Sequence, residues 1–407
     1  MESWERNVWA LALVVFIAFV GFQFSAPFLP LYVRELGVTD AAQVALWSGL
    51  LAAVTPAVSG LLAPVFGRLA DRFGRKLMLI RSLVGFTVII AAMGLVTSVH
   101  QFLIARFVQG LFAGFSPMAM AVASVSAPRD KVPVAIARVQ GAQLLSVAVG
   151  PAVGGLVASR LGIRPAFFVT AGLCAVSLVA LIVLFREARP LEPGETRPTR
   201  RATPLREFLR YRHFVPVMVL LLIAQFIDRG LALMIPLQVA HMPGVEAVAA
   251  TSGLIISIAA VGAALSASVV ARLSEAVSTG RLLLAQLLVG GAGCCAMALA
   301  RSPAELLALR TLVALCLGGA LTLAYSLGGS IVPSETRGAA FGWLALGVQI
   351  GTAASPLLTG ALAAVSLGGA YLMDAGLAWI GATVLLLVAR DLLRRREPGR
   401  GDAAFPR

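Results

Sequence analysis

The decapeptide Gly67-Arg68-Leu69-Ala70-Asp71-Arg72-Phe73-Gly74-Arg75-Lys76 is a charged stretch between two long apolar segments. A helix needs about 20 mostly apolar residues to cross the hydrocarbon core of a bilayer. The flanking segments, residues 44–66 and 77–98, both reach that length. We therefore expect two membrane-spanning helices joined by a short charged loop at the membrane surface.

The rest of the chain has the same apolar character. Its 407 residues are 59% hydrophobic and only 13% charged, with a mean hydropathy of +0.91, whereas soluble proteins contain about 25% charged residues. Such an apolar excess cannot be buried in one soluble core, so lipid must solvate part of it. Backbone groups in hydrocarbon need hydrogen-bond partners within their own segment, and the alternating pattern of membrane strands is absent from the sequence. We predict an all-α polytopic membrane protein with twelve transmembrane helices at residues 8–33, 44–66, 77–98, 101–126, 132–159, 165–185, 214–240, 248–271, 282–300, 304–330, 336–364 and 369–390.

One long polar segment, residues 186–213, divides the apolar segments into two groups of six. The groups match at an offset of about 204 residues, so that Arg106 parallels Arg310 and Gly114 parallels Gly318. Parallel six-helix repeats place a substrate site between the halves near the bilayer midplane, and rocking of the halves alternates access to it. We predict two six-helix bundles around a central cavity, made of an N-terminal half (1–185), a cytoplasmic linker (186–213), a C-terminal half (214–390) and a cytoplasmic tail (391–407).

The formal net charge of +14 is carried between the apolar segments. This placement favours a membrane surface over nucleic acid as the partner of the basic residues. If the N-terminus is cytoplasmic, the opposite side of the membrane holds only Arg34, Arg160, Arg164 and Arg301. Because cytoplasmic loops carry the excess of Lys and Arg, we expect a multi-pass protein of the cell (inner) membrane with both termini in the cytoplasm.

The decapeptide at 67–76 resembles the signature loop of the major facilitator superfamily, both in its residues and in its place after the second helix. The resemblance implies a cytoplasmic gate, in which Asp71 accepts hydrogen bonds from the N-terminal end of the eleventh helix. Glycines at both ends of the loop permit tight turns and close helix approach. The cations could pair with acids or lipid, or they could only set the topology. The candidate gating residues are Gly67, Asp71, Arg72, Gly74, Arg75 and Lys76.

Arg106-Phe107-Val108-Gln109-Gly110, in the fourth helix, looks like a second motif of this family, Arg-x-x-Gln-Gly. Placing an arginine inside the membrane costs free energy, so an arginine found there indicates a functional role. In proton-coupled members of the family this arginine is associated with the proton pathway. The alternative is a structural hydrogen-bond anchor to the first helix.

The fifth helix carries Gly150-Pro151-Ala152-Val153-Gly154-Gly155, which resembles the core of the antiporter motif found mainly in exporters. Small residues allow close helix approach, and ordinary packing would give the same pattern. The match is partial, because Ala137 and Ser146 stand where the family usually has glycine. Together with the segment 27–37, the chain is similar to the twelve-helix drug:proton antiporter branch. The candidate antiporter residues are Gly150, Pro151, Gly154 and Gly155.

Asp228 is an acid placed well inside a predicted helix. It follows the cytoplasmic start of the seventh helix by about 14 residues, or roughly 21 Å, and Arg310 lies about 9 Å from the outer end of the tenth. We predict that these two side chains face each other, as a proton-coupling pair or as a structural ion pair that never titrates. The first helix carries Gln23 where some drug:proton antiporters have an acid, and Asp374 is assigned to the first turn of the last helix as a structural residue. The candidate proton-coupling residues are Asp228, Arg106 and Arg310.

The resemblance implies a secondary active transporter that exports amphipathic small molecules or drugs by proton antiport through alternating access. The alternatives are a metabolite or sugar-type carrier, or a transport-dead membrane sensor or scaffold. We expect a monomer in the lipid bilayer with no enzymatic activity, cofactor, metal or nucleic-acid partner, and the sequence has no Gly-Lys-Ser/Thr phosphate loop for ATP. Aromatic, Met and amide groups suit large apolar compounds. The candidate substrate-binding residues are Gln23, Gln109, Phe115, Met118, Gln225, Asp228 and Tyr325.

Overall fold

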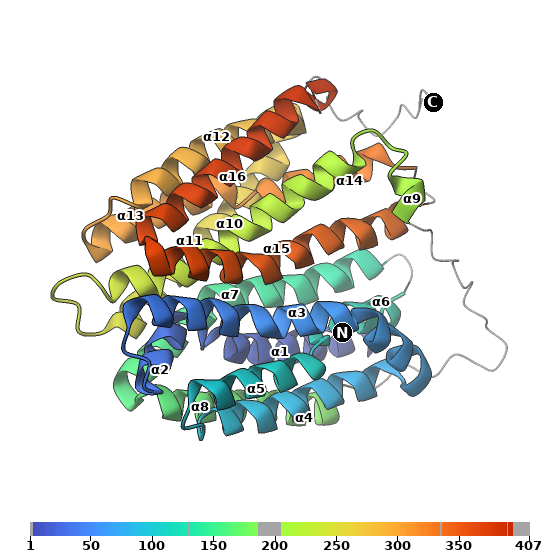
Figure 1. Cartoon of the computed structure of the whole chain (residues 1–407). Helices are drawn as coiled ribbons and strands as arrows, with labels where there is room; N and C mark the ends of the chain where they lie inside the picture. The colour runs from blue at the N-terminus through green and yellow to red at the C-terminus, as the bar shows by residue number, and fades with distance from the viewer. Residues whose placement is uncertain (1–2, 129–130, 186–204, 334–335, 389, 394–407) are drawn as a thin grey trace. The chain divides into compact units, whose positions relative to one another are not determined.

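The computed structural model describes residues 3–128, 131–185, 205–333, 336–388 and 390–393. In these ranges, twelve helical spans are long and apolar enough to cross a membrane. The predicted all-α fold with twelve membrane-length helices is therefore confirmed. Within these ranges, the side-chain positions that stay outside the described part are those of Ser3, Pro64, Asp71, Leu205, Arg337, Gly338, Leu392 and Leu393. Helices of the first half are α1 (Ser3–Gln23), η1 (Ala26–Phe28), α2 (Leu29–Glu35), α3 (Ala41–Phe73), α4 (Arg75–Met93), α5 (Val99–Leu111), α6 (Phe115–Ser126), α7 (Val132–Leu161) and α8 (Ile163–Leu184) (Figure 1).

The second half of the chain also contains six membrane-length spans. Its helices are α9 (Leu205–Phe208), α10 (Phe214–Val239), α11 (Val248–Leu273), α12 (Thr279–Met297), α13 (Pro303–Leu317), α14 (Ala320–Ile331), α15 (Arg337–Val365), α16 (Leu367–Leu387) and η2 (Arg390–Leu393). The membrane span is broken in the fourth position of each half, at α5–α6 and at α13–α14. The glycines predicted to be equivalent, Gly114 and Gly318, lie at these two breaks.

At each break, a polar side chain from a neighbouring helix forms hydrogen bonds with main-chain groups. Arg81, on α4, donates to the carbonyl oxygens of Leu111 (2.9 Å) and Ala113 (3.0 Å). In the second half, the main-chain N–H of Gly319 donates to Ser266 Oγ at 3.1 Å, and Gln286 on α12 donates to the same oxygen. Because α4 and α12 are the third spans of their halves, Arg81 and Gln286 serve the two breaks from corresponding helices.

The chain forms two compact units. Unit 1 contains α1 to α8 together with residues 232–260 and 356–365, which supply the ends of α10, α11 and α15. Unit 2 contains the remaining parts of α10, α11 and α15 with α9, α12, α13, α14 and α16. The predicted linker falls largely on residues 186–204 and the predicted tail on 394–407, outside the described residues, so the division into halves stays a prediction.

Unit 1 is organised around α1, which packs on α7 and α8, while α4 lies along α8 (Figure 1). One end of unit 1 holds an aromatic cluster of Phe28, Tyr32, Phe102 and Phe167, with ring centroids 4.9 to 5.8 Å apart. The Tyr32 hydroxyl donates to the Met93 carbonyl at 2.6 Å. This cluster fixes α5, the helix that carries Arg106, against α2 and α8.

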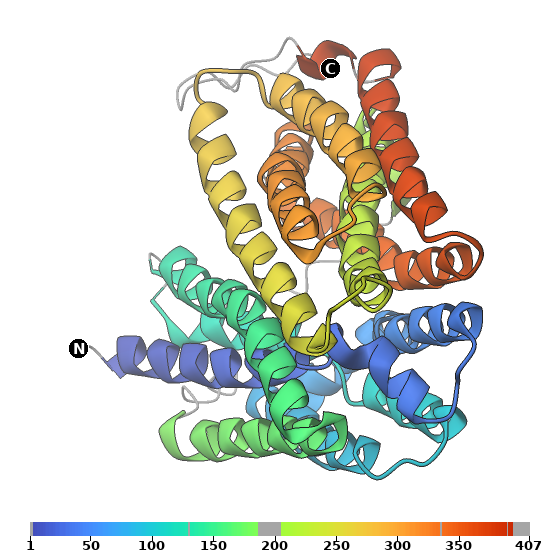
Figure 2. The ribbon, with the colours of Figure 1, turned by 90° about the vertical axis from the view of Figure 1, so that its left-hand side faces the viewer.

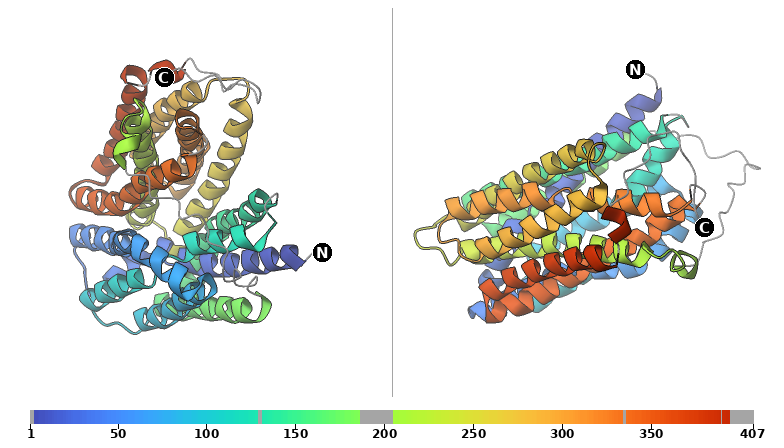
Figure 3. Two further views of the ribbon diagram at one scale, coloured as in Figure 1. Left: turned by 90° about the vertical axis from the view of Figure 1, so that its right-hand side faces the viewer. Right: turned by 90° about the horizontal axis from the view of Figure 1, so that it is seen from above.

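Unit 2 is organised around α12, which packs along α16 and against α13 and α14 (Figure 3). On its other side α10 lies close to α15, because small residues of α15 recur every four positions. An added Cβ at Gly347 or Gly351 would meet the carbonyl oxygens of Met218 and Leu222 at 2.7 and 2.6 Å. Ser355 donates to the Phe226 carbonyl at 2.6 Å. This packing holds α10, and with it Asp228, in place.

Candidate functional site

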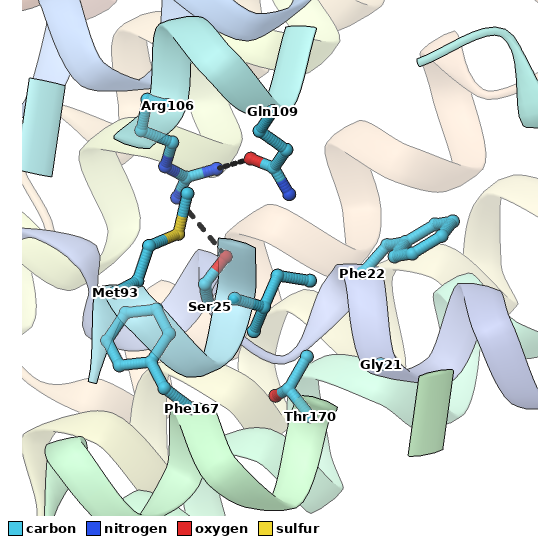
Figure 4. Close-up of a pocket in the computed structure, with 9 residues that line it drawn as sticks. Gly21, Phe22, Ser25, Met93, Arg106, Gln109, Phe167 and Thr170 are labelled. Carbon is cyan, nitrogen blue, oxygen red and sulfur yellow. Dashed lines mark hydrogen bonds between the residues drawn. The ribbon is translucent and has the colours of Figure 1, made fainter. Parts of the chain in front are cut away.

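Arg106 lies at a small cavity in unit 1. Its Nη1 donates to Gln109 Oε1 (3.5 Å) and its Nη2 to Ser25 Oγ (3.4 Å), while Nε is buried without a partner. The guanidinium lies 5.3 Å from the centroid of the Phe102 ring. Figure 4 shows Arg106 and Gln109 pointing toward Ser25. The cavity holds about 20 Å³ and is lined by Gly21, Phe22, Ser25, Ile90, Met93, Arg106, Gln109, Phe167 and Thr170.

The bond to Ser25 links Arg106 to the first span, as the alternative of a structural anchor requires, while the role in a proton pathway stays a prediction. A second bond ties α5 to α3, since Thr55 donates to the Arg106 carbonyl at 2.8 Å. Within the described ranges no carboxylate forms an ion pair with Arg106. A cation held by neutral groups in an apolar interior is costly, so this position attracts negative charge or a polar molecule.

Asp228 and Arg310 form an ion pair in unit 2. Arg310 Nη2 donates to Asp228 Oδ1 at 3.3 Å, which confirms the predicted pairing. The Arg310 side chain is 9% exposed and the Asp228 side chain is 50% exposed. Arg310, on α13, is therefore buried, while Asp228, on α10, remains accessible.

Asp374 differs from its expected place. Because Ser366 caps α16 by accepting the N–H of Gly369 at 3.0 Å, the helix begins at Leu367, and Asp374 lies two turns inside it. The residue is 0% exposed, and both carboxyl oxygens are buried without a hydrogen-bond partner. The expected place in the first turn of the helix is wrong. An acid in an otherwise apolar 21-residue helix was the available signal.

The charged loop at 67–76 is shorter in the structure than in the prediction. Helix α3 continues to Phe73, and Gly74 alone makes the turn with φ of +90°, a conformation that glycine adopts without strain. Gly67 lies inside α3 with nothing within 4 Å of an added Cβ. The tight turn or close approach predicted at Gly67 is therefore wrong here, because helical hydrogen bonding extends past it.

The cations of this loop contact main-chain oxygens. Arg75 donates to the Ala121 carbonyl at 2.9 Å, and Lys76 donates to the Phe185 carbonyl, which follows the last turn of α8, at 2.7 Å. Positive charge at a helix C-terminus is favourable, and these bonds tie α4 to α6 and α8. Arg72 lies over the Phe73 ring. The predicted gating role rests on the side chain of Asp71, which lies outside the described residues.

The antiporter motif packs α7 against two helices of unit 1. An added Cβ at Gly150 would meet Gln23 Cβ at 2.6 Å, and one at Gly154 would meet Phe24 Cα at 2.5 Å, so the two glycines touch the last residue of α1 and the residue that follows it. On another face, Gly155 meets the Ala249 carbonyl and Pro151 faces Gly253, both on α11 (Figure 2). Ser146, which replaces a usual glycine, is buried and donates to the Phe16 carbonyl of α1 at 3.2 Å.

The substrate candidates fall in both units and have different surroundings. Phe115 is buried against Phe19 and Phe22, with ring centroids 6.1 and 6.0 Å apart, and Met118 is buried, so both have core environments. Gln109 bonds Arg106, as described above, and Gln23 faces Gly150. The candidates in unit 2 are Gln225, buried beside Gly351, Tyr325, whose ring lies 5.9 Å from that of Phe341, and Asp228.

Comparison with known proteins identifies the family. The family model described as "Major Facilitator Superfamily" matches residues 11–251 and 248–406. The chain belongs to the major facilitator superfamily. It is accordingly a multi-pass membrane protein of a transporter family.

Two relatives are similar over nearly the full length. The "Multidrug resistance protein MdtG" of Citrobacter koseri is 30% identical over 398 residues, covering 97% of both chains. The protein of the same name from Escherichia fergusonii is 31% identical over 399 residues, again with 97% of both chains covered.

Solved structures show the same fold. A bacterial homologue of the human lysosomal transporter Spinster, in an inward-facing and unoccupied conformation, matches with a TM-score of 0.79, covering 98% of this chain and 100% of that one at 17% identity. The human organic anion transporter MFSD10 (TETRAN) matches with a TM-score of 0.67, covering 95% and 100% at 16% identity.

Proposed function

We propose that this chain is a secondary active exporter of amphipathic small molecules, driven by proton antiport through alternating access. The similarity to proteins named multidrug resistance protein MdtG, over 97% of both chains, supports the substrate class. We further propose that it acts as a monomer in the cell membrane without altering its substrate chemically. Both termini are cytoplasmic in this proposal, because the loop at 72–76 and the linker then follow the positive-inside rule.

The ion pair of Asp228 and Arg310 carries the proton-coupled part of the proposal. A carboxylate that is half exposed can exchange protons with water, while its buried partner responds to the change in charge. Protonation of Asp228 would break the pair and take this partner from a buried cation, which is costly unless another group replaces it. Proton binding and a change in the packing of α10 and α13 are thereby linked.

The gate proposed at residues 67–76 follows from the family resemblance. Asp71 would cap the N-terminal end of α15 when the cytoplasmic side is closed, and Arg72 would remain at the surface. The bonds that Arg75 and Lys76 make to α6 and α8 would keep the base of this loop rigid.

The test is an export assay in cells without their own major efflux pumps. Cells that express the chain should accumulate less of an amphipathic dye than cells with an empty vector, and a proton uncoupler should abolish the difference. Asp228→Asn should lose the uncoupler-sensitive export at normal expression, whereas Glu246→Gln, a change at an exposed loop acid, should keep it. Equal dye levels in expressing and empty cells would contradict the export proposal, and full coupling in Asp228→Asn would contradict the role of the ion pair.

A further inference from the structure

Asp374 is the one acidic residue that is fully buried among the residues that the structure describes. It lies two turns into α16, where this helix packs along α12. Neither of its carboxyl oxygens has a hydrogen-bond partner. An ionised carboxyl in such surroundings would be an uncompensated charge, which proteins avoid by pairing the group or by protonating it.

Arg310 shares the interior of unit 2 with this acid, because α13 and α16 both pack on α12. Arg310 and Asp228 both lie within electrostatic range of Asp374. Arg310 uses Nη2 for Asp228, while its Nε is buried with no partner. The interior of unit 2 therefore holds a guanidinium with an unused donor and a carboxyl with unused acceptors.

The other titratable groups near Asp374 carry no charge at neutral pH. Asp228, Arg310 and Asp374 form one charged cluster. Cys294, on α12, and Tyr371, one turn before Asp374 on α16, interact with this cluster electrostatically. A thiol and a phenol are both neutral under ordinary conditions. The charges of the cluster thus come from one guanidinium and two carboxyls, so the cluster is electrically neutral only when one of the carboxyls holds a proton.

We propose that Asp374 is a second proton-binding group of this transporter, and that Asp374 and Asp228 compete for the single guanidinium of Arg310. In the arrangement of this structure, Arg310 is bonded to Asp228 and Asp374 holds the proton. When Asp228 takes a proton from water, Arg310 is released and pairs with Asp374, which gives up its own proton to water admitted by the change in packing of α10 and α13. One proton enters at α10 and one leaves at α16, and the cluster remains neutral throughout.

This inference rests on the proposed proton antiport, but its first test does not depend on transport. Purified protein in lipid is studied by infrared difference spectroscopy, which detects the C=O stretching band of a protonated carboxylic acid. We expect this band at neutral pH in the wild type, its loss in Asp374→Asn, and no change in Glu246→Gln. An absent band in the wild type, or a band that persists in Asp374→Asn, overturns the proposal.

Asp228→Asn provides the sharper test, because it leaves Asp374 in place. With Asp228 neutral, Arg310 has only one carboxyl to pair with, so we expect Asp374 to ionise and the band to disappear. An unchanged band in Asp228→Asn would show that Arg310 is not shared and would overturn the proposal. This variant also serves if Asp374→Asn fails to fold.

Transport in vesicles then separates this inference from the proposed function. Asp374→Asn should retain exchange of labelled drug for unlabelled drug, which needs no net proton movement, and should lose accumulation driven by a pH gradient. Gradient-driven accumulation equal to the wild type would overturn the role of Asp374. If the wild type itself shows no response to the gradient, the antiport proposal fails, while the infrared bands still decide whether the two carboxyls share Arg310.

Discussion

The main-chain N–H of Ala152 donates to Ser257 Oγ at 2.9 Å, across the contact between α7 and α11 in unit 1. Ala152 directly follows Pro151, whose ring removes a hydrogen bond from the middle of α7. Ser257 is buried, so its hydroxyl replaces water at this weakened point of the helix. The antiporter motif therefore contacts α11 both through this hydrogen bond and through the close approach of Gly155.

Ser257→Ala should destabilise the protein, because it leaves a backbone donor without its partner in the interior. We expect a loss of about 1 kcal/mol, the usual net contribution of such a bond. The measurement is the thermal unfolding midpoint in detergent. Ser268→Ala is the matched control, since Ser268 is exposed and bonds only within α11. Equal midpoints for the wild type and Ser257→Ala would show that the bond contributes nothing.

Gly154→Val should abolish transport and reduce the yield of folded protein. An added Cβ already meets Phe24 Cα at 2.5 Å, so α7 and α1 would have to separate. Gly141→Val is the control in the same helix, because nothing lies within 4 Å of a Cβ at that position. The comparison uses transport per folded molecule, from monodisperse protein in size-exclusion chromatography. If both variants behave alike, helix propensity and not contact with α1 is the determining factor.

Arg81→Leu should destabilise unit 1 by removing two donors at the break between α5 and α6. Hydrogen bonds to a charged group contribute about 1.5–3 kcal/mol each, and the half-buried position of Arg81 places the expected loss near the lower end of that range. The unfolding midpoint checks this, with Arg160→Leu at the exposed end of α7 as the control. A midpoint for Arg81→Leu that equals that of the control would mean that water replaces the guanidinium at the break.

The helices and the main ion pair could be predicted from the sequence because they depend on local properties. Membrane-spanning length follows from apolar runs, and the depth of a residue in a straight helix follows from the rise per residue. The rise per residue therefore predicts similar depths for Asp228 and Arg310, and the two side chains are in contact.

The predictions for Asp374 and Gly67 are wrong. Both depend on where a helix begins or ends, which is fixed by a single cap or turn residue and not by the length of an apolar run. Ser366 starts α16 before the apolar run suggested, and Gly74 ends α3 later than the charged residues implied. The roles of Arg81 and Ser257 could not be predicted, because they depend on which neighbouring helix faces a break or a proline.

Arg106→Lys should lower the maximal transport rate while leaving the protein folded. The guanidinium bonds Gln109 and Ser25 at the same time, and an ammonium group on a flexible stem cannot reproduce this fork. We expect a reduction of about tenfold, equivalent to about 1.4 kcal/mol in the barrier. Initial rates in vesicles over a range of drug concentrations give kcat and KM separately. Arg34→Lys, at the exposed end of α2, is the control, and equal kcat in all three proteins would exclude a specific role for the fork.

Asp228 and Arg310 should show a favourable coupling energy in a double-mutant cycle. Asp228→Asn alone leaves Arg310 with Asp374 as its remaining carboxyl, whereas Arg310→Gln alone removes the cation from Asp228, which water can still reach, and from the buried Asp374. We therefore expect Arg310→Gln to be the more destabilising single change, and the double variant to be more stable than the sum of the two predicts, by about 1 kcal/mol. Unfolding midpoints of the four proteins supply the cycle. Strict additivity would mean that the 3.3 Å contact contributes no net stability, and the pair would then matter for proton exchange alone.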